Sequence, residues 1–295
     1  SALEHTGVVL WIAVAVLIVN AFVNYGLIFG HFGLPELGLR GAAIASVIAM
    51  TLSLVGFVVY IQIYFPEQKM FSRFWRFDQA ATYAVAKLAV PISATALAEA
   101  GLFAATAFMM GWLGKLELAA HGIVLQLAAM TFMVHMGLSQ AGTVRVGKAF
   151  ARNDWVAVKR TASVAMGLSS LAAVIAIFFF LVMPEILIGA FLEEEDPLTA
   201  EILYIGSILL ILASMFQFVD AAQVMALSLL RGLQDTRIPM LIAATSYWLV
   251  GMPISYVSGF VWDFQEIGIW CGLVIGLALV AILLWTRFFI LTRIK

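Results

Sequence analysis

The chain has 295 residues, of which 64% are hydrophobic and 11% are charged, and its formal net charge is −1. A soluble domain carries about 25% charged residues, so this sequence is too apolar for a soluble globular protein and for a disordered one. The net charge is near zero, so the chain has no excess of basic residues such as a nucleic-acid-binding protein carries. Cys271 is the single cysteine, which excludes an intrachain disulfide and a thiolate metal cluster. These exclusions leave a polytopic membrane protein.

Eight apolar runs are long enough to cross a bilayer, which takes roughly 20 helical residues for about 30 Å of hydrocarbon. Pro91 and Pro253 fall inside two of the runs and are expected to kink those helices. No run shows the ten-residue alternation of a membrane β-barrel, so the sequence predicts an all-α polytopic membrane protein with eight transmembrane helices. The runs lie at 8–29, 42–64, 82–112, 117–142, 161–192, 199–229, 239–261 and 267–291.

The basic residues predict an orientation for these spans. The connections after the second, fourth and sixth spans, together with the C-terminal end, hold thirteen of the 16 Lys and Arg residues. The alternate connections hold only Arg40 and Lys115 and most of the acidic residues between spans. Because cytoplasmic loops carry the excess of Lys and Arg, we expect the even-numbered connections and the C-terminus to be cytoplasmic.

A short internal repeat bears on the domain organisation. Glu36-Leu37-Gly38-Leu39 follows the first span and Glu266-Ile267-Gly268-Ile269 follows the seventh. An offset of six spans preserves orientation and indicates a parallel repeat. The flank before the first apolar segment has no Lys or Arg, unlike the start of a signal peptide, so this segment is interpreted as a true span of a protein whose beginning lies upstream. We expect residues 1–80 to form the last two helices of an N-terminal bundle with a cytoplasmic linker. Residues 81–295 are expected to form a C-terminal six-helix bundle.

Two carboxylates lie inside predicted spans. Glu99 is about 18 Å along the helix from Lys87, and Asp220 is about 16 Å from Arg231, at a rise of about 1.5 Å per residue. Both are therefore expected near the middle of the bilayer, where an acidic side chain costs roughly 2.5–3.5 kcal/mol. Such residues face a cavity, a partner side chain, an ion or a substrate.

Helical spacing places polar neighbours on the faces of both carboxylates. Since no intramembrane Lys or Arg is predicted to pair with Glu99 or Asp220, we interpret them as a cation site for Na⁺ or a proton, with no other metal site and no catalytic residue. A carboxylate satisfied by neighbouring hydroxyls and amides is the alternative. The residues expected to line the cavity beside them are Thr95, Thr106, Phe216 and Gln223.

The remaining polar residues within spans carry weaker signals. His121 and His135 are about 21 Å apart along one predicted helix, too far to share a metal ion, and are interpreted as structural. Asn20 and Asn24 are either packing hydrogen bonds or a second polar stripe.

Several motifs together resemble the multidrug and toxic compound extrusion (MATE) family, nearest to its bacterial NorM-like branch. The resemblance covers essentially the whole chain, as about the last eight of twelve spans. Its motifs are 20–41, 91–101 with Glu99, 137–154, 219–232 and Ser246-Tyr247-Trp248.

The resemblance implies twelve spans in two bundles around a cavity that alternates between the two faces of a bacterial inner membrane. Glu99 and Asp220 match the family's acidic residues in its seventh and tenth spans. NorM-like members carry an aromatic hydroxyl one turn before the second acid, where this chain has Phe216. A complete Na⁺ shell is therefore not carried over, and the coupling ion stays open.

The function expected from these features is secondary active efflux of cationic or amphipathic drugs or toxic metabolites, by antiport with Na⁺ or H⁺. The expected partners are the lipid bilayer and small organic cations, with no nucleic acid, no cofactor and a monomeric full-length protein. A lipid-linked oligosaccharide flippase is the first alternative, but its cavity needs bases for pyrophosphate and none is expected beside the two acids. An intramembrane enzyme is the second, although the sequence has no HExxH motif and two isolated intramembrane acids do not by themselves make a catalytic dyad.

Overall fold

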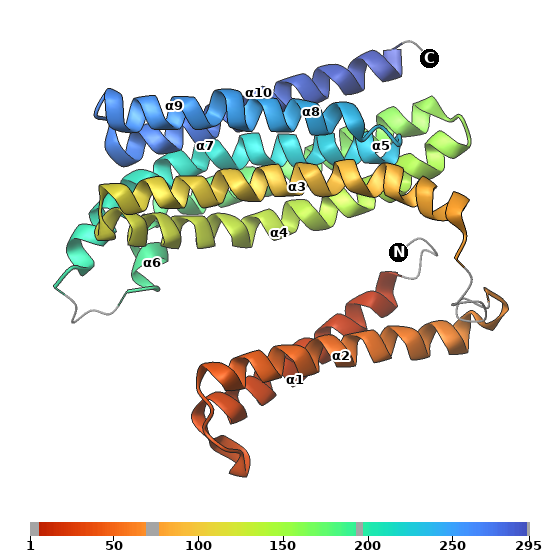
Figure 1. The fold of residues 1–295 in the computed structure, drawn as a ribbon, viewed down its shortest axis with the longest axis horizontal. Helices are drawn as coiled ribbons and strands as arrows, with labels where there is room; N and C mark the ends of the chain where they lie inside the picture. The colour runs from red at the N-terminus through yellow and green to blue at the C-terminus, as the bar shows by residue number, and fades with distance from the viewer. Residues whose placement is uncertain (1–5, 69–76, 193–196, 294–295) are drawn as a thin grey trace. The chain divides into compact units, whose positions relative to one another are not determined.

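The structure is a computed structural model that describes residues 6–68, 77–192 and 197–293. Every regular element within these residues is helical (Figure 1), and eight segments are long and apolar enough to cross a membrane. The predicted all-α fold class with eight transmembrane helices is therefore confirmed. Seven of the spans are the helices α1 (Thr6–Phe29), α2 (Leu39–Tyr64), α3 (Gln79–Leu113), α4 (Lys115–Ala151), α5 (Trp155–Val182), α7 (Thr199–Gly232) and α10 (Gln265–Arg293).

The seventh span in chain order, Arg237–Val261, is assembled from shorter pieces. Pro253 was predicted to kink this span, and π-helical turns stand on both sides of it. A wider turn accommodates a proline, which lacks an N–H and would collide with the carbonyl of the preceding turn. The pieces are α8 (Arg237–Thr245), the π-helical Ser246–Gly251, α9 (Met252–Tyr256) and the π-helical Val257–Val261; the short α6 (Pro184–Gly189) lies outside the spans.

The end of α4 lies beyond its predicted position. The apolar run was predicted to end at residue 142, whereas the helix continues to Ala151. Arg145 and Lys148 end the hydropathy signal without ending the helix, because their straight side chains favour helical backbone.

The fifth span is displaced toward the N-terminus from its predicted range, 161–192. The Asp154 carboxylate accepts a hydrogen bond of 2.9 Å from the Ala157 backbone N–H, which caps the start of α5. The helix ends at Val182, because Pro184 cannot continue its hydrogen bonding and instead begins α6.

Backbone contacts divide the chain into two compact units, Ser1–Gln79 and Ala80–Lys295. The assignment of these regions to two bundles of a longer transporter stays a prediction. In the first unit α1 packs on α2, and Asn20 Nδ2 donates to the Ala45 carbonyl at 3.3 Å while Asn24 Nδ2 donates to Asn20 Oδ1 at 3.0 Å. These bonds favour packing hydrogen bonds over a second polar stripe for the two asparagines.

Within the second unit α7 is the central helix. It packs against α4, α5, α6 and α10, and its side chains from Asp220 to Leu230 are buried with the single exception of the partly buried Ala222. Small and apolar side chains around the whole circumference are typical of a helix enclosed by others.

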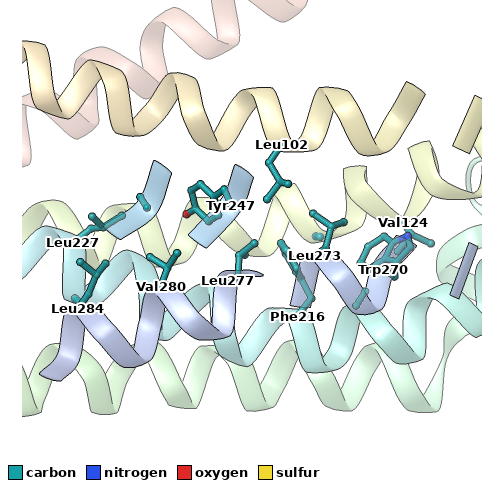
Figure 2. Packing of buried hydrophobic residues seen from close by; sticks show 14 of the residues in the cluster. Leu102, Val124, Phe216, Leu227, Tyr247, Trp270, Leu273, Leu277, Val280 and Leu284 are labelled. Carbon is teal, nitrogen blue, oxygen red and sulfur yellow. The ribbon is translucent and has the colours of Figure 1, made fainter. Parts of the chain in front are cut away.

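A continuous apolar stripe on α10 packs against this centre (Figure 2). Its members recur at alternating spacings of three and four residues, which is one face of a helix. In Figure 2 they lie beside Phe216 and Leu227 of α7 and Tyr247 of the seventh span. The stripe consists of Trp270, Leu273, Leu277, Val280 and Leu284, all fully buried.

The seventh span and α10 approach each other through small residues. A Cβ atom on Gly276 would lie 3.0 Å from the Gly251 Cα atom, so these backbones are in contact. Ser255 Oγ donates to the Ile269 carbonyl at 3.0 Å, and Ser258 Oγ donates to the Gly268 carbonyl at 2.7 Å. Close packing of glycine and serine with interhelical hydrogen bonds is the usual means of joining helices in lipid.

By contrast, α3 stands apart from the other helices of its unit. It is absent from the pairs of helices whose backbones pack extensively, and side chains make its connections instead. Trp248 Nε1 donates to the Ala98 carbonyl at 3.2 Å, and the Leu102 side chain is fully buried in the core. This spacing leaves room beside α3 for a cavity.

Candidate functional site

A cavity of about 470 Å³ lies among α3, α4 and α7, and its volume is within the range of small-molecule sites. Its wall is apolar except for three charged side chains, Glu99, Asp220 and Arg231. The cavity is open because the alanines on α3 and α4 have side chains too short to fill the space between the helices. The other lining residues are Ala96, Ala100, Phe103, Leu125, Ala128, Ala129, Phe132, Met136, Phe216, Val224 and Leu227.

Asp220 is the least satisfied of the charged groups. Its side chain is 2% exposed, and no hydrogen-bond donor is found for it within the described part of the chain. A buried ionised carboxylate without a partner is unfavourable by several kcal/mol. A proton or a bound cation would remove this cost.

Glu99 is held by a side-chain amide of the neighbouring helix α7. Gln223 Nε2 on α7 donates to Glu99 Oε1 on α3 at 2.9 Å. This bond fixes the carboxylate that faces Asp220 and is one of the few links between α3 and α7. Both predicted acids thus line one cavity, while their role in binding a cation stays a prediction.

The expectation that no base would accompany the acids is wrong. Arg231 was assigned to the connection after the sixth span, but α7 continues to Gly232 and brings the guanidinium into the cavity lining. It interacts electrostatically with Glu99, yet no ion pair joins it to either carboxylate among the residues described. With both acids ionised, the cavity would carry a net charge of −1.

The four predicted neighbours of the acids have different places. Phe216 lines the cavity and makes edge-to-face contacts with Phe103 and Trp270, each at a centroid distance of 5.9 Å. Gln223 is not in the lining but positions Glu99, as described above.

Thr95 and Thr106 are not in the cavity lining either. The Thr95 hydroxyl donates to the Pro91 carbonyl and the Thr106 hydroxyl to the Phe103 carbonyl, each at 2.9 Å. Both hydroxyls are thus occupied by carbonyls of their own helix. Because neither residue is in the cavity lining, neither hydroxyl oxygen is placed beside a cation bound between the two acids.

Tyr247 is a polar residue of the site that the sequence analysis did not assign. Its side chain is fully buried and lies near enough to Glu99, Asp220 and Arg231 for their charges to act on its hydroxyl group. Its hydroxyl lies beside Gln223, outside strict hydrogen-bond geometry, and the Gln223 Oε1 atom is likewise buried without a donor. A tyrosine inside an apolar span was the signal available in the sequence.

The two histidines of α4 are separate structural groups. His121 Nδ1 accepts a hydrogen bond of 3.1 Å from Trp270 Nε1 on α10, and His135 Nδ1 is hydrogen-bonded to Ser169 Oγ on α5 at 2.8 Å. Each therefore ties α4 to a different neighbour. No group of three metal-ligating side chains occurs among the described residues.

Comparisons with known proteins agree with this architecture. The family model MatE matches residues 91–257. The chain is 41% identical to a probable multidrug resistance protein NorM of Agrobacterium fabrum and 43% identical to one of Rhizobium meliloti, covering 99% of this chain and 63% of each relative. A solved structure, the eukaryotic MATE transporter AtDTX14, has a TM-score of 0.79 at 19% identity over 93% of this chain and 60% of that one. The chain thus spans less than two thirds of the length of these relatives.

Proposed function

Because this chain belongs to the MatE family, we propose that it acts in a membrane transporter that exports small organic cations in exchange for an inward-moving cation. The observation that carries the proposal is Asp220, a carboxylate that faces a cavity and has no partner among the described residues. The relatives named above are described as multidrug resistance proteins. Their names give no support to an oligosaccharide flippase or to an intramembrane enzyme.

The charges of the cavity suggest how exchange works. Two ionised carboxylates and Arg231 leave one negative charge, which a single monovalent cation neutralises. Two cations would leave the cavity with a positive charge in a low-dielectric medium, which is unfavourable. An organic cation and a coupling ion are therefore expected to compete for one site, and competition for one site is the simplest form of antiport.

We propose that the coupling ion is a proton. A hard metal cation prefers several oxygen ligands, and the only carboxylate oxygens in the cavity are those of Glu99 and Asp220. Phe216 offers no hydroxyl, and Thr95 and Thr106 are not in the cavity lining. A proton needs a single oxygen. Because one proton enters for each monovalent organic cation that leaves, no net charge moves and the pH gradient is the driving force: one pH unit supplies about 1.4 kcal/mol, enough for roughly a tenfold substrate gradient.

The test uses the full-length gene product in proteoliposomes loaded with a fluorescent organic cation such as ethidium. An imposed pH gradient, acidic on the side to which ethidium moves, should drive its transport, and an equal Na⁺ gradient at constant pH should not. Transport with the Na⁺ gradient alone would contradict the proton assignment but not the antiport. Equal transport without any gradient would contradict antiport itself.

Arg231 gives a prediction about binding. Arg231→Gln removes the positive charge and should tighten the binding of a monovalent organic cation by roughly tenfold, the size expected for charges about 10 Å apart at an effective dielectric constant of about 20. Arg231→Lys keeps the charge and serves as the control, with little change expected. Equilibrium dialysis of ethidium against the purified protein measures both. Weaker binding in Arg231→Gln would show that the guanidinium does not oppose the substrate.

The orientation also belongs to the proposal. The match to the MatE family and the bacterial origin of the relatives support a multi-pass protein of the plasma membrane, and the distribution of Lys and Arg supports a cytoplasmic C-terminus. A reporter that fluoresces only in the cytoplasm, fused after the last residue, should therefore be fluorescent.

A further inference from the structure

A second cavity, of about 750 Å³, lies between α5 and α10. None of its lining residues belongs to the acidic cavity described above. It is called the α5–α10 groove below. Its lining residues are Lys159, Ala162, Ser163, Met166, Trp285, Phe288, Phe289, Thr292 and Arg293.

The groove follows from the way the helices pack. Both α5 and α10 lie along α7, but they are not among the pairs of helices that pack extensively on each other. The space between them is floored by buried side chains, Ala162 on α5 and Phe288 on α10. Trp285 Nε1 donates to the Ala222 carbonyl of α7 at 2.9 Å and so fixes one wall.

The groove has a polar end and an apolar end. Lys159 lies near the first turn of α5 and Arg293 in the last turn of α10. Met166 and Trp285 lie about 10 and 12 Å further along their helices, and Phe289 between them is 58% exposed. Neither cation forms an ion pair within the residues described. A pair of cations without an ion-pair partner among the described residues, beside the exposed aromatic side chain of Phe289, makes the groove amphipathic.

We infer that the α5–α10 groove binds one anionic glycerophospholipid. The phosphate would lie between Lys159 and Arg293, with the exposed Ser163 hydroxyl as a further donor, and an acyl chain would cover Phe289 and Trp285. Basic pockets between transmembrane helices are the sites at which anionic head groups bind. This inference depends on the helices spanning a membrane and does not depend on the transported substrate.

The charge of the groove selects among lipids. A zwitterionic head group brings its own cation close to Lys159 and Arg293, whereas phosphatidylglycerol brings a net negative charge. A free phosphate ion would satisfy the cations but would leave the aromatic wall exposed. The bound lipid would join α5 to α10, which otherwise meet mainly through α7.

The first experiment titrates the purified protein in detergent with phosphatidylglycerol and counts bound lipids by native mass spectrometry. Lys159→Gln with Arg293→Gln should weaken binding of the tightest lipid about 30-fold, taking the effect of each cation on anionic-lipid attraction as additive. Arg152→Gln with Arg160→Gln removes two exposed cations from the same region that are not in the groove lining. This control pair should bind like the parent.

The second experiment tests the apolar end. Phe289 and Ile290 are neighbouring exposed residues of α10, and only Phe289 lines the groove. Phe289→Asn should weaken phosphatidylglycerol binding, and Ile290→Asn should not, although both substitutions make the helix more polar. Inorganic phosphate at millimolar concentration should fail to displace the lipid.

Three results would overturn the inference. If the Lys159, Arg293 variant and the Arg152, Arg160 control lose phosphatidylglycerol affinity equally, the lipid is attracted to surface charge in general and not to the groove. Equal affinity for phosphatidylcholine would remove the role of the cations. Displacement of the lipid by phosphate, with no effect of Phe289→Asn, would identify a small-anion site instead of a lipid site.

Discussion

Asp220→Asn should abolish ion-driven export while the protein remains folded and inserted in the membrane. The substitution keeps the size of the side chain and its capacity for hydrogen bonds but removes the group that can take up a proton or attract a cation. It also lowers the cost of placing the residue within the membrane, so instability would not explain the loss. Glu99→Gln should have the same effect if the two carboxylates act as one site, and the double variant should then be no worse than either single one.

The measurement is ethidium efflux from vesicles that contain the full-length gene product, under an imposed cation gradient and at matched expression. Glu201→Gln is the matched control, because Glu201 is an exposed acid in the first turn of the same helix, α7, as Asp220. It should transport at the parent rate. Parent rates in Asp220→Asn would show that the carboxylate serves packing and not coupling.

The two acids could be predicted from the sequence because a charge inside an apolar run is conspicuous whatever surrounds it. Their neighbours could not. Thr95 and Thr106 share the helix face of Glu99, but spacing does not reveal that a threonine hydroxyl in a helix bonds to a carbonyl one turn earlier. The place of a residue on a helix face is readable from the sequence, and the direction of its polar atom is not.

Arg231 and Tyr247 were missed for a different reason. Hydropathy locates where an apolar run stops, and Arg231 stops it, but α7 continues to Gly232 and carries the guanidinium into the cavity. Tyr247 approaches Glu99 from the seventh span, and Gln223 from α7. Such meetings of distant helices depend on tertiary packing, which one unaligned sequence does not encode in any local pattern.

Gly272→Ala should destabilise the fold, and the reason lies in the contact between α10 and the seventh span. A Cβ atom on Gly272 would collide with the backbone nitrogen, the Cα atom and the hydroxyl oxygen of Ser255. The hydroxyl cannot turn aside without cost, because it donates to the Ile269 carbonyl at 3.0 Å. The backbone atoms can be relieved only by moving the two helices apart, and overpacking of this kind costs about 1–3 kcal/mol or more.

Gly167→Ala is the matched control for this prediction, since a Cβ atom on that glycine of α5 meets nothing within 4 Å. Alanine is favoured over glycine in a helix by roughly 1 kcal/mol, so the control should be neutral or slightly more stable. Thermal unfolding of the purified protein in detergent should show Tm lowered by about 2–5 °C in Gly272→Ala. Tm changes of opposite sign in Gly272→Ala and Gly167→Ala would distinguish a steric collision from helix propensity, because helix propensity alone would stabilise both variants. An unchanged Tm in Gly272→Ala would mean that the seventh span and α10 are not in the close contact on which the position of Tyr247 beside the acidic cavity depends.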